Sequence, residues 1–218
     1  MSVVDVVIPT KSNFGDLERL IGQLSMDASV GLIVIVCDGP NALKHVSRLI
    51  QDKVVIFAVP VGTGIHNMWN IGMDYLQKRN NHIAFINDDV SISENCVSLV
   101  AGLIDSDPTL GLVSPCVDNS TTEPFIPSTG FAGFCMFLVR DLVSKWRFDE
   151  RMRWWYGDVD VICWVSQAEN RRTGVTGVAS CSGNRSQTIV NDPPPNFQRD
   201  IENDARLFAE KWPAAKQL

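Results

Sequence analysis

Long apolar runs, a targeting segment and an excess of positive charge are all missing from this sequence. Its longest apolar stretches, such as residues 3–8 and 31–37, have the length of strands and fall well short of the roughly 20 apolar residues that span a bilayer. The N-terminus has no basic flank, long apolar stretch or small-residue cleavage site, so we expect a cytoplasmic protein without a transmembrane segment. The net charge of −6 gives no general attraction to nucleic-acid phosphates or anionic lipid, which disfavours binding to either.

Clustered cysteines and phosphate-binding loops are missing as well. The six cysteines are scattered without a CxxC pair, and most lie in apolar runs, where a free cysteine packs as a small hydrophobe. Because zinc sites need clustered ligands, zinc and redox chemistry are disfavoured, and reduced thiols fit an intracellular protein. There is no GxxxxGKS/T loop, and the turn Gly62-Thr63-Gly64 is not a dinucleotide fingerprint because Asn67 stands at the third glycine position. ATP-type phosphoryl transfer is therefore unsupported.

What is present is the composition and pattern of an α/β chain. Its 218 residues, 45% of them hydrophobic, are enough to bury a core in one domain without disulfides. Helix-like periodicity, first seen after Asn13, alternates with strand-like apolar runs. The strand-like runs are residues 3–10, 32–37, 54–59 and 82–87. This alternation predicts a parallel, doubly wound sheet flanked by helices.

The second half of the chain departs from this alternation. Ser91 and Glu94 form a capping-box pattern that predicts a helix start after the fourth strand. Beyond it we expect strands at 110–117, 131–140 and near 175–181, a helix to about residue 170 and a last helix near 200–211. No repeat and no clear linker divides the chain, so residues 1–218 are expected to form a single domain.

Polar residues and glycines stand where ligands gather in an open parallel sheet, at the carboxyl ends of the strands. These ends carry Pro9-Thr10, Asp38-Gly39, the glycine turn at 62–64 and Asn87-Asp88-Asp89. Adjacent carboxylates repel each other unless a cation or hydrogen-bond donors balance them, and Mg²⁺ and Mn²⁺ prefer oxygen ligands. The same residue types are also common in turns and helix caps, so both interpretations stay open at this point.

A second candidate region lies around Asp158. Its carboxylate stands at the start of an apolar-periodic helix, where it can cap the helix or, beside aromatic walls, act as a general base. The preceding run Trp154-Trp155-Tyr156 is too bulky to face one core, so we expect at least one of these rings to line a surface or cleft.

In combination and order, six segments resemble the family-two glycosyltransferases with the GT-A fold. They are VVIPT, IVIVCDGP, GTGIHNMWNIG, AFINDDV, GFAGFCMFLVR and RFDERMRWWYGDVDV. The resemblance runs from about residue 4 to residue 174. Asn87 at the first acidic position, and a last helix ending in Lys211-Trp212-Pro213, resemble the rhamnosyltransferase-like branch of the family.

The resemblance implies an inverting, metal-dependent hexosyltransferase-type enzyme with one GT-A domain. Residues 1–117 would bind a nucleotide-diphosphate sugar and residues 118–218 the acceptor. Asp158 is implied as the catalytic base, and Asp89, assisted by Asp88, as the ligand of Mn²⁺ or Mg²⁺. The implied donor-binding residues are Pro9, Thr10, Asp38, Gly39, Gly64, Asn70 and Asp88, and the implied acceptor-binding residues are Gly133, Trp154, Trp155 and Asp160.

Two departures from the family pattern are visible. Gly157 replaces the Glu that usually precedes the catalytic Asp, which bears on acceptor recognition. Many relatives also have a metal-binding His on a late strand, whereas no His follows His82 here, so Ser182, Asn184 or water is expected to fill that position.

Other functions are weighed against this one. A catalytically idle module that holds a nucleotide or sugar would use the same cleft, and a sugar nucleotidylyltransferase would need a Gly-rich, Arg-containing loop that residues 9–15 do not supply. The interleaved Trp and Arg residues of 146–155 suit a glycan, a protein or an extruded nucleobase as acceptor, with nucleic acid disfavoured by the acidic balance. Residues 118–130 and 182–196 are candidate lids.

Overall fold

The first four strands form a parallel sheet in the computed structural model of the chain, which describes residues 2–49, 52–128, 131, 133–183, 193 and 196–215. They lie side by side in the order β3-β2-β1-β4, and all of their pairings are parallel. Their bounds are Val4–Thr10 for β1, Val30–Asp38 for β2, Val54–Val59 for β3 and His82–Ile86 for β4. Because the strands are parallel, their carboxyl ends meet at one edge of the sheet.

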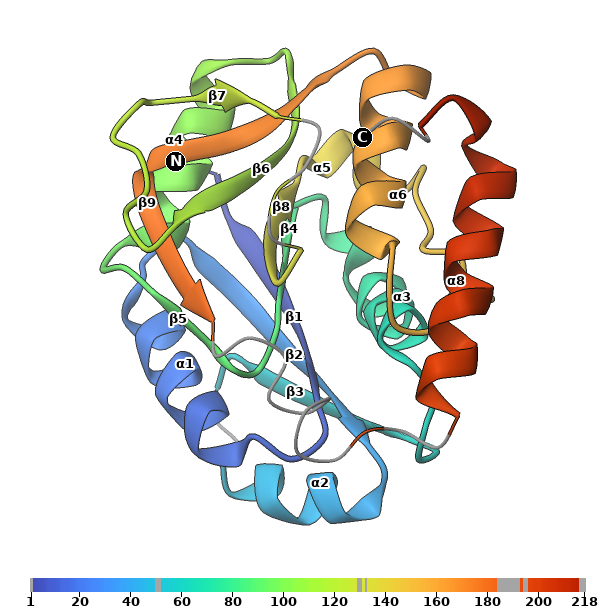
Figure 1. Ribbon diagram of the computed structural model, residues 1–218. Coiled ribbons are helices and arrows are strands. Elements are labelled where there is room, and N and C mark those ends of the chain that lie inside the picture. The colour runs from blue at the N-terminus through green and yellow to red at the C-terminus, as the bar shows by residue number, and fades with distance from the viewer. Residues whose placement is uncertain are drawn as a thin grey trace.

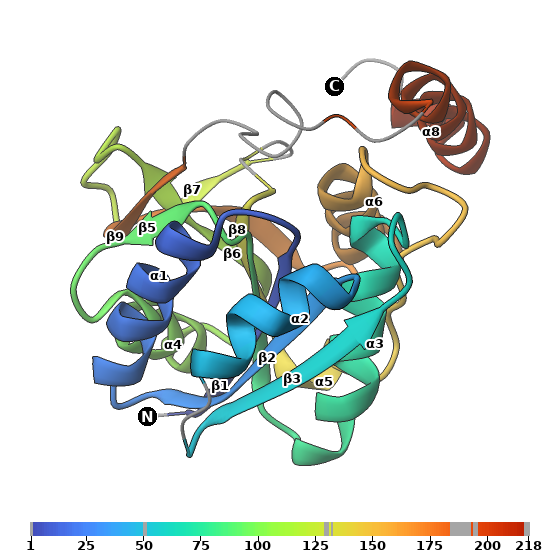
Figure 2. The same cartoon turned by 90° about the horizontal axis from the view of Figure 1, so that it is seen from below.

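Helices cover both faces of this sheet, as Figures 1 and 2 show. Side chains of a strand alternate between the two faces, so Val6 and Ile8 of β1 pack into one core and Val7 packs into the other. The first core receives α1, α2 and α4, and the second receives α3, α5 and α6. These helices span Phe14–Met26 (α1), Pro40–Val46 (α2), Ile65–Leu76 (α3), Cys96–Ser106 (α4), Arg140–Val143 (α5) and Gly157–Cys163 (α6). Burial on both faces explains why the strands are continuous β-branched runs.

The second half extends the sheet with mixed pairings. Strand β8 runs antiparallel to β4 and β6, whereas β6 runs parallel to β9. Strands β5 and β7 both pair antiparallel with β9. The bounds are Val90–Ile92 (β5), Leu110–Val117 (β6), Ile126–Pro127 (β7), Cys135–Leu138 (β8) and Arg172–Gly183 (β9).

After α6 the chain continues through a π-helix, Trp164–Ala168, and short 3₁₀ turns follow α2 and α3. The helix near the C-terminus, α8, spans Phe197–Lys211 and lies beside α6 (Figures 1 and 2). It packs through Leu207 and Phe208 on a small cluster that includes Met152 and Cys163, separate from the two main cores. The long element α8 is therefore attached to the segment that contains Asp158 rather than to the sheet.

Several expected boundaries differ from the structure. The capping-box prediction at Ser91 and Glu94 is wrong: residues 90–92 form β5, because the alternating Val90 and Ile92 are both buried and pair with β9, and α4 begins only at Cys96. Asn13 does precede α1, but its side chain makes no cap hydrogen bond. Strand β8 is shorter than expected and β9 longer.

In the part of the chain that the structure describes, no helix has both the length and the apolar character that a membrane crossing requires. All six cysteines are buried and unpaired.

Candidate functional site

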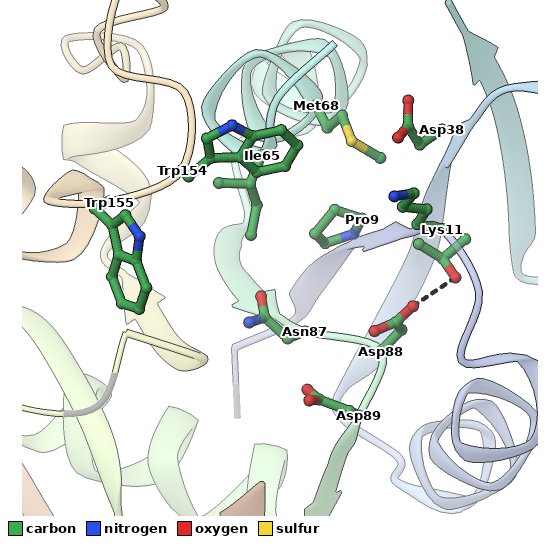
Figure 3. Close-up of a pocket in the computed structure, with 11 residues that line it drawn as sticks. Pro9, Lys11, Asp38, Ile65, Met68, Asn87, Asp88, Asp89, Trp154 and Trp155 are labelled. Atoms are coloured by element: carbon green, nitrogen blue, oxygen red, sulfur yellow. Dashed lines mark hydrogen bonds between the residues drawn. The ribbon is translucent and has the colours of Figure 1, made fainter. Parts of the chain in front are cut away.

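Two adjoining cavities lie at the carboxyl edge of the parallel strands. The first cavity, of about 160 Å³, is shown in Figure 3 and is lined by Pro9, Thr10, Lys11, Asp38, Ile65, Met68, Asn87, Asp88, Asp89, Trp154 and Trp155. The second cavity, of about 430 Å³, is lined by Ile65, His66, Trp69, Asn87, Asp89, Gly133, Phe134, Trp154, Trp155, Tyr156, Gly157, Asp158 and Gly183. Five residues line both cavities: Ile65, Asn87, Asp89, Trp154 and Trp155. The two cavities thus form one continuous site, with Asp38 in its first part and Asp158 in its second.

Asp38 ends β2, and a short turn holds its carboxylate at the rim of the first cavity. Its Oδ1 accepts a hydrogen bond from the backbone N–H of Gly62 at 2.7 Å, which ties β2 to the glycine turn after β3. Gly39, which follows it, has a φ of 93°, and a Cβ there would overlap the side chain of Val61. Glycine is therefore required for the chain to turn away from the cavity directly after Asp38.

Asp88 is a buried carboxylate whose two oxygens are both engaged by the protein. Oδ2 accepts a hydrogen bond from Thr10 Oγ1 at 2.7 Å, drawn in Figure 3, and Oδ1 accepts one from Asn13 Nδ2 at 3.2 Å. Burial raises the pKa of Asp88 to about 6, although these hydrogen bonds favour the charged form. In this arrangement Asp88 joins β4 to the end of β1 and lines the first cavity, and its expected part in metal binding stays a prediction.

Asp89 and Asn87 are placed differently from Asp88, since both line the two cavities. Asp89 is 8% exposed and stands immediately before β5. The Oδ1 atom of Asn87 is buried and, among the described residues, has no hydrogen-bond partner. A buried oxygen without a partner is costly unless a ligand supplies one, so the pair Asn87 and Asp89 marks a place where a ligand is expected to bind.

Asp158 stands in the first turn of α6, at the wall of the second cavity. Its Oδ1 accepts the backbone N–H of Val159 at 2.9 Å, and the backbone of Gly133 also donates to the carboxylate. A Cβ on Gly133 would overlap the carboxylate, so the closeness of the two segments requires glycine. Withdrawal from water raises the pKa of Asp158 above its usual value, and the backbone hydrogen bonds only partly oppose this. The capping and general-base interpretations are compatible, because the carboxylate bonds the helix start and still lines the cavity.

Gly157, which stands where the resembling family has Glu, has no room for a side chain. A Cβ there would overlap the imidazole of His66, whose Nδ1 lies 2.5 Å from the carbonyl oxygen of Met152. Burial lowers the pKa of His66 to about 4, so the ring is neutral at pH 7 and donates Nδ1–H to that carbonyl. His66 thus occupies the space over Gly157 with an uncharged polar group.

Four of the expected site residues, and one residue expected to replace the missing His, lie outside both cavities. Asn70 is buried and holds the backbone of Phe148 through bonds of 2.9 and 3.0 Å. The carboxylate of Asp160 is fully buried and accepts bonds from Lys211 Nζ at 2.8 Å and Trp212 Nε1 at 2.6 Å, so it fastens the end of α8 instead of reaching the second cavity. Gly39 and Gly64 directly precede α2 and α3 with positive φ and line neither cavity, and Ser182 lines a separate pocket. Asn184 lies outside the described residues.

Parts of the two candidate lids, 118–130 and 182–196, lie outside the described residues. Within 118–128 the chain is bonded to β9: Gly177 N–H donates to the Glu123 carbonyl at 2.8 Å, and Thr176 Oγ1 donates to the Pro124 carbonyl at 2.6 Å. Most of 184–195 is not described.

The sequence patterns missed some lining residues. Lys11 follows Pro9-Thr10 directly, so its place at the end of β1 gave a usable signal. Met68 and Trp69 were expected only on the apolar face of α3, and His66 was not expected at the site. Helical periodicity does not indicate which turn of a helix lines a cavity.

No protein-family model and no curated protein matches the sequence. Among solved structures, that of GalNAc-T7 with UDP, GalNAc and Mn²⁺ is similar over 100% of this chain and 52% of that chain, with a TM-score of 0.70 and 13% identity. The structure of S. aureus TarS 1–349 is similar over 98% of this chain and 73% of that one, with a TM-score of 0.63 and 11% identity. The chain therefore spans about half of the GalNAc-T7 chain. At these identities the likeness concerns the fold, and the curled, mostly parallel sheet with flanking helices has the GT-A architecture of these glycosyltransferases.

Proposed function

We propose that the chain is a glycosyltransferase that moves a sugar from a nucleotide-diphosphate sugar to an acceptor hydroxyl with inversion. The observation that carries this proposal is the continuous pair of cavities, with Asp38 in the first, Asp89 in both and Asp158 in the second. The first cavity would take the nucleotide and diphosphate, and the second the acceptor. The fold supports this, since a protein of the same architecture has been solved with UDP, GalNAc and Mn²⁺.

The donor set of the first cavity suits a diphosphate with a divalent cation. Mg²⁺ and Mn²⁺ are commonly held by one or two carboxylates together with substrate phosphates. Asp89 supplies one carboxylate and Asn87 an amide oxygen without a partner, while the described residues contain no cluster of three His, Cys, Asp or Glu that could hold a metal without substrate. When bound, such an ion would neutralise the charge that develops on the leaving diphosphate. Lys11 lines the same cavity and adds positive charge from the protein.

Asp158 would act as the base. Its raised pKa makes it a better proton acceptor than an ordinary aspartate, and the bonds from Val159 and Gly133 fix its orientation. It would take the proton of the acceptor hydroxyl as that oxygen attacks the anomeric carbon from the face opposite the diphosphate. Trp155, which is 40% exposed, offers a flat apolar surface beside it for a ring of the acceptor.

Finer assignments belong to this proposal as well. Hexosyl transfer, a place in the rhamnosyltransferase-like branch and a cytoplasmic location remain predictions from sequence, the last supported by six buried, unpaired cysteines. The donor half at 1–117 and the acceptor half at 118–218 are likewise proposed.

A panel of nucleotide-diphosphate sugars tests the proposal. The chain is incubated with each donor and Mn²⁺, and release of the nucleoside diphosphate is followed with and without chelator. We expect at least one donor to be turned over in a metal-dependent way and the anomer of the product to be opposite to that of the donor. Donor binding without any release would support the idle binding module instead, and retention of the anomer would refute the inverting mechanism.

A further inference from the structure

Two buried carboxylates of helix α8, Asp200 and Asp204, bond residues 153–155, the segment whose tryptophans line both cavities. The carboxylate of Asp204 is fully buried and accepts hydrogen bonds from three successive backbone N–H groups. These are the N–H groups of Arg153 at 3.0 Å, Trp154 at 2.9 Å and Trp155 at 3.1 Å. Successive amides that converge on one anion fix the backbone of the whole turn. One carboxylate of α8 therefore holds the backbone from which the side chains of Trp154 and Trp155 extend.

Asp200, one helical turn earlier on the same face of α8, holds the side chains of this segment. Its Oδ2 accepts a bond from Arg153 Nη1 at 3.0 Å and a longer one from Trp154 Nε1 at 3.4 Å. Asp200 is 7% exposed, so water competes little for these bonds.

Arg153 carries the connection onward to the first cavity. Its Nη2 donates to the carbonyl oxygen of Gly62, and the N–H of that glycine donates to Asp38. The carbonyl of Arg153 accepts the N–H of Ile65, the first residue of α3, at 2.9 Å. A continuous chain of hydrogen bonds thus runs from α8 through Arg153 to the turn that holds Asp38.

We propose that Arg153, Asp200 and Asp204 are positioning residues, which set the distance between the donor-side turn and the tryptophan wall. None of the three is among the residues that line either cavity, so they would act through Gly62, Trp154 and Trp155. The functional side of this inference rests on the proposed glycosyl transfer, in which a misplacement of about 1 Å can cost on the order of 10²-fold in rate.

Hydrogen–deuterium exchange of the full chain tests the connection without any substrate. In Asp204→Asn the amide oxygen can replace only part of the carboxylate's bonds, so protection at residues 153–155 should fall by roughly 10-fold, the loss typical of a hydrogen bond to a charged group. If Arg153 transmits the change, the amides of Gly62 and Ile65 should lose protection as well. The matched control is Glu202→Gln, which changes an exposed carboxylate on the same helix that accepts a bond from Gln198, and it should leave all of these amides unchanged.

Affinity for UDP with Mn²⁺, measured by calorimetry, supplies the functional readout. Lysine has a single terminal nitrogen and lacks the planar fork with which Arg153 bonds Asp200 through Nη1 and Gly62 through Nη2. Arg153→Lys and Asp200→Asn should therefore each raise the Kd about 5–10-fold. The double variant should be no worse than the single ones, because both break the same connection.

The proposal is overturned if Asp204→Asn loses protection at 153–155 while Gly62 and Ile65 keep theirs, since α8 would then only pack locally. It is also overturned if the wild-type chain binds UDP with Mn²⁺ and both Arg153→Lys and Asp200→Asn bind it equally well. If the wild-type chain does not bind UDP at all, the proposed function fails for UDP donors, and the exchange at Gly62 and Ile65 still decides whether α8 positions the turn. Asp200→Asn serves in the exchange experiment if Asp204→Asn does not fold.

Discussion

The variant Asp158→Asn tests whether Asp158 acts as the base, because it should remove proton acceptance while keeping the fold of the site. The substitution keeps the size of the side chain and leaves an oxygen that can still accept the N–H of Val159, so the start of α6 should be preserved. What it removes is the ability to accept a proton from the acceptor hydroxyl. Positioned proton transfer typically contributes about 10²–10⁴-fold to a rate, so turnover should fall within that range.

The same variant should not lose stability. Burial raises the pKa of Asp158 in the folded chain, which means that the folded state holds the proton more tightly than the unfolded state. Folding stability therefore decreases as the pH rises from the unfolded pKa through the folded pKa, and at pH 7 the ionised carboxylate costs stability. A neutral amide removes that cost but has only one oxygen to accept the bonds from Val159 and Gly133. Since the two effects oppose each other, we expect a midpoint of thermal unfolding close to that of wild type.

The assay combines three measurements on one protein preparation: turnover of a donor found in the panel, affinity for UDP with Mn²⁺, and the thermal midpoint. The expected result is lost turnover with affinity for UDP within about threefold of wild type and no loss of stability. The control is Asp52→Asn, which removes an exposed carboxylate far from both cavities and should change none of the three. Turnover that survives in the folded Asp158→Asn chain would refute the role of Asp158 as base.

Three further results are expected. Gly157→Ala should lower the thermal midpoint, because its Cβ would overlap His66 and overpacking of this kind typically costs about 1–3 kcal/mol; an unchanged midpoint would show that the imidazole can move aside. Asp89→Ala should weaken Mn²⁺-dependent binding of UDP by at least roughly 10-fold, since even residues that only hydrogen-bond to metal ligands contribute that much to affinity. Equal affinity by calorimetry would show that Asp89 is not a metal ligand. The rate should fall as the pH is lowered through the raised pKa of Asp158, so the acid limb of the pH–rate profile should lie above the range of an ordinary aspartate, and a limb at the ordinary value would contradict this.

The fold of the first half could be predicted from sequence because its strands are buried on both faces. Continuous runs such as those of β1 and β2 are typical of central parallel strands, and the structure has both at nearly the expected residues. The boundaries failed where a strand is short: the pattern of Ser91 and Glu94 fits a helix start, and only the pairing of β5 with β9, about ninety residues later, decides otherwise. Pairings between distant segments leave no local signal in one sequence.

The candidate site was predictable at strand ends and unpredictable wherever a polar side chain bonds a distant segment. The sheet topology brings Asp38 and Asp89 to one edge, as expected from parallel strands. Asp160 looks like a site carboxylate in the sequence, yet it is bonded to the end of α8, and Asp88 lines the first cavity while also bonding Thr10 and Asn13. These carboxylates hold distant segments of the chain together. The spacing of residues in the sequence does not reveal which partners they bond.

The proposed donor half, 1–117, does not supply all of the residues that line the first cavity. Trp154 and Trp155 belong to the second half of the sequence, yet they line the first cavity as well as the second. Arg153 beside them is bonded both to α8 and to Gly62, which holds Asp38. Under the proposed positioning role of α8, a ligand in the first cavity would contact a wall whose position depends on this helix. Substitutions of Asp200 or Asp204 in α8 should consequently change donor affinity, whereas a site confined to residues 1–117 would leave that affinity unchanged.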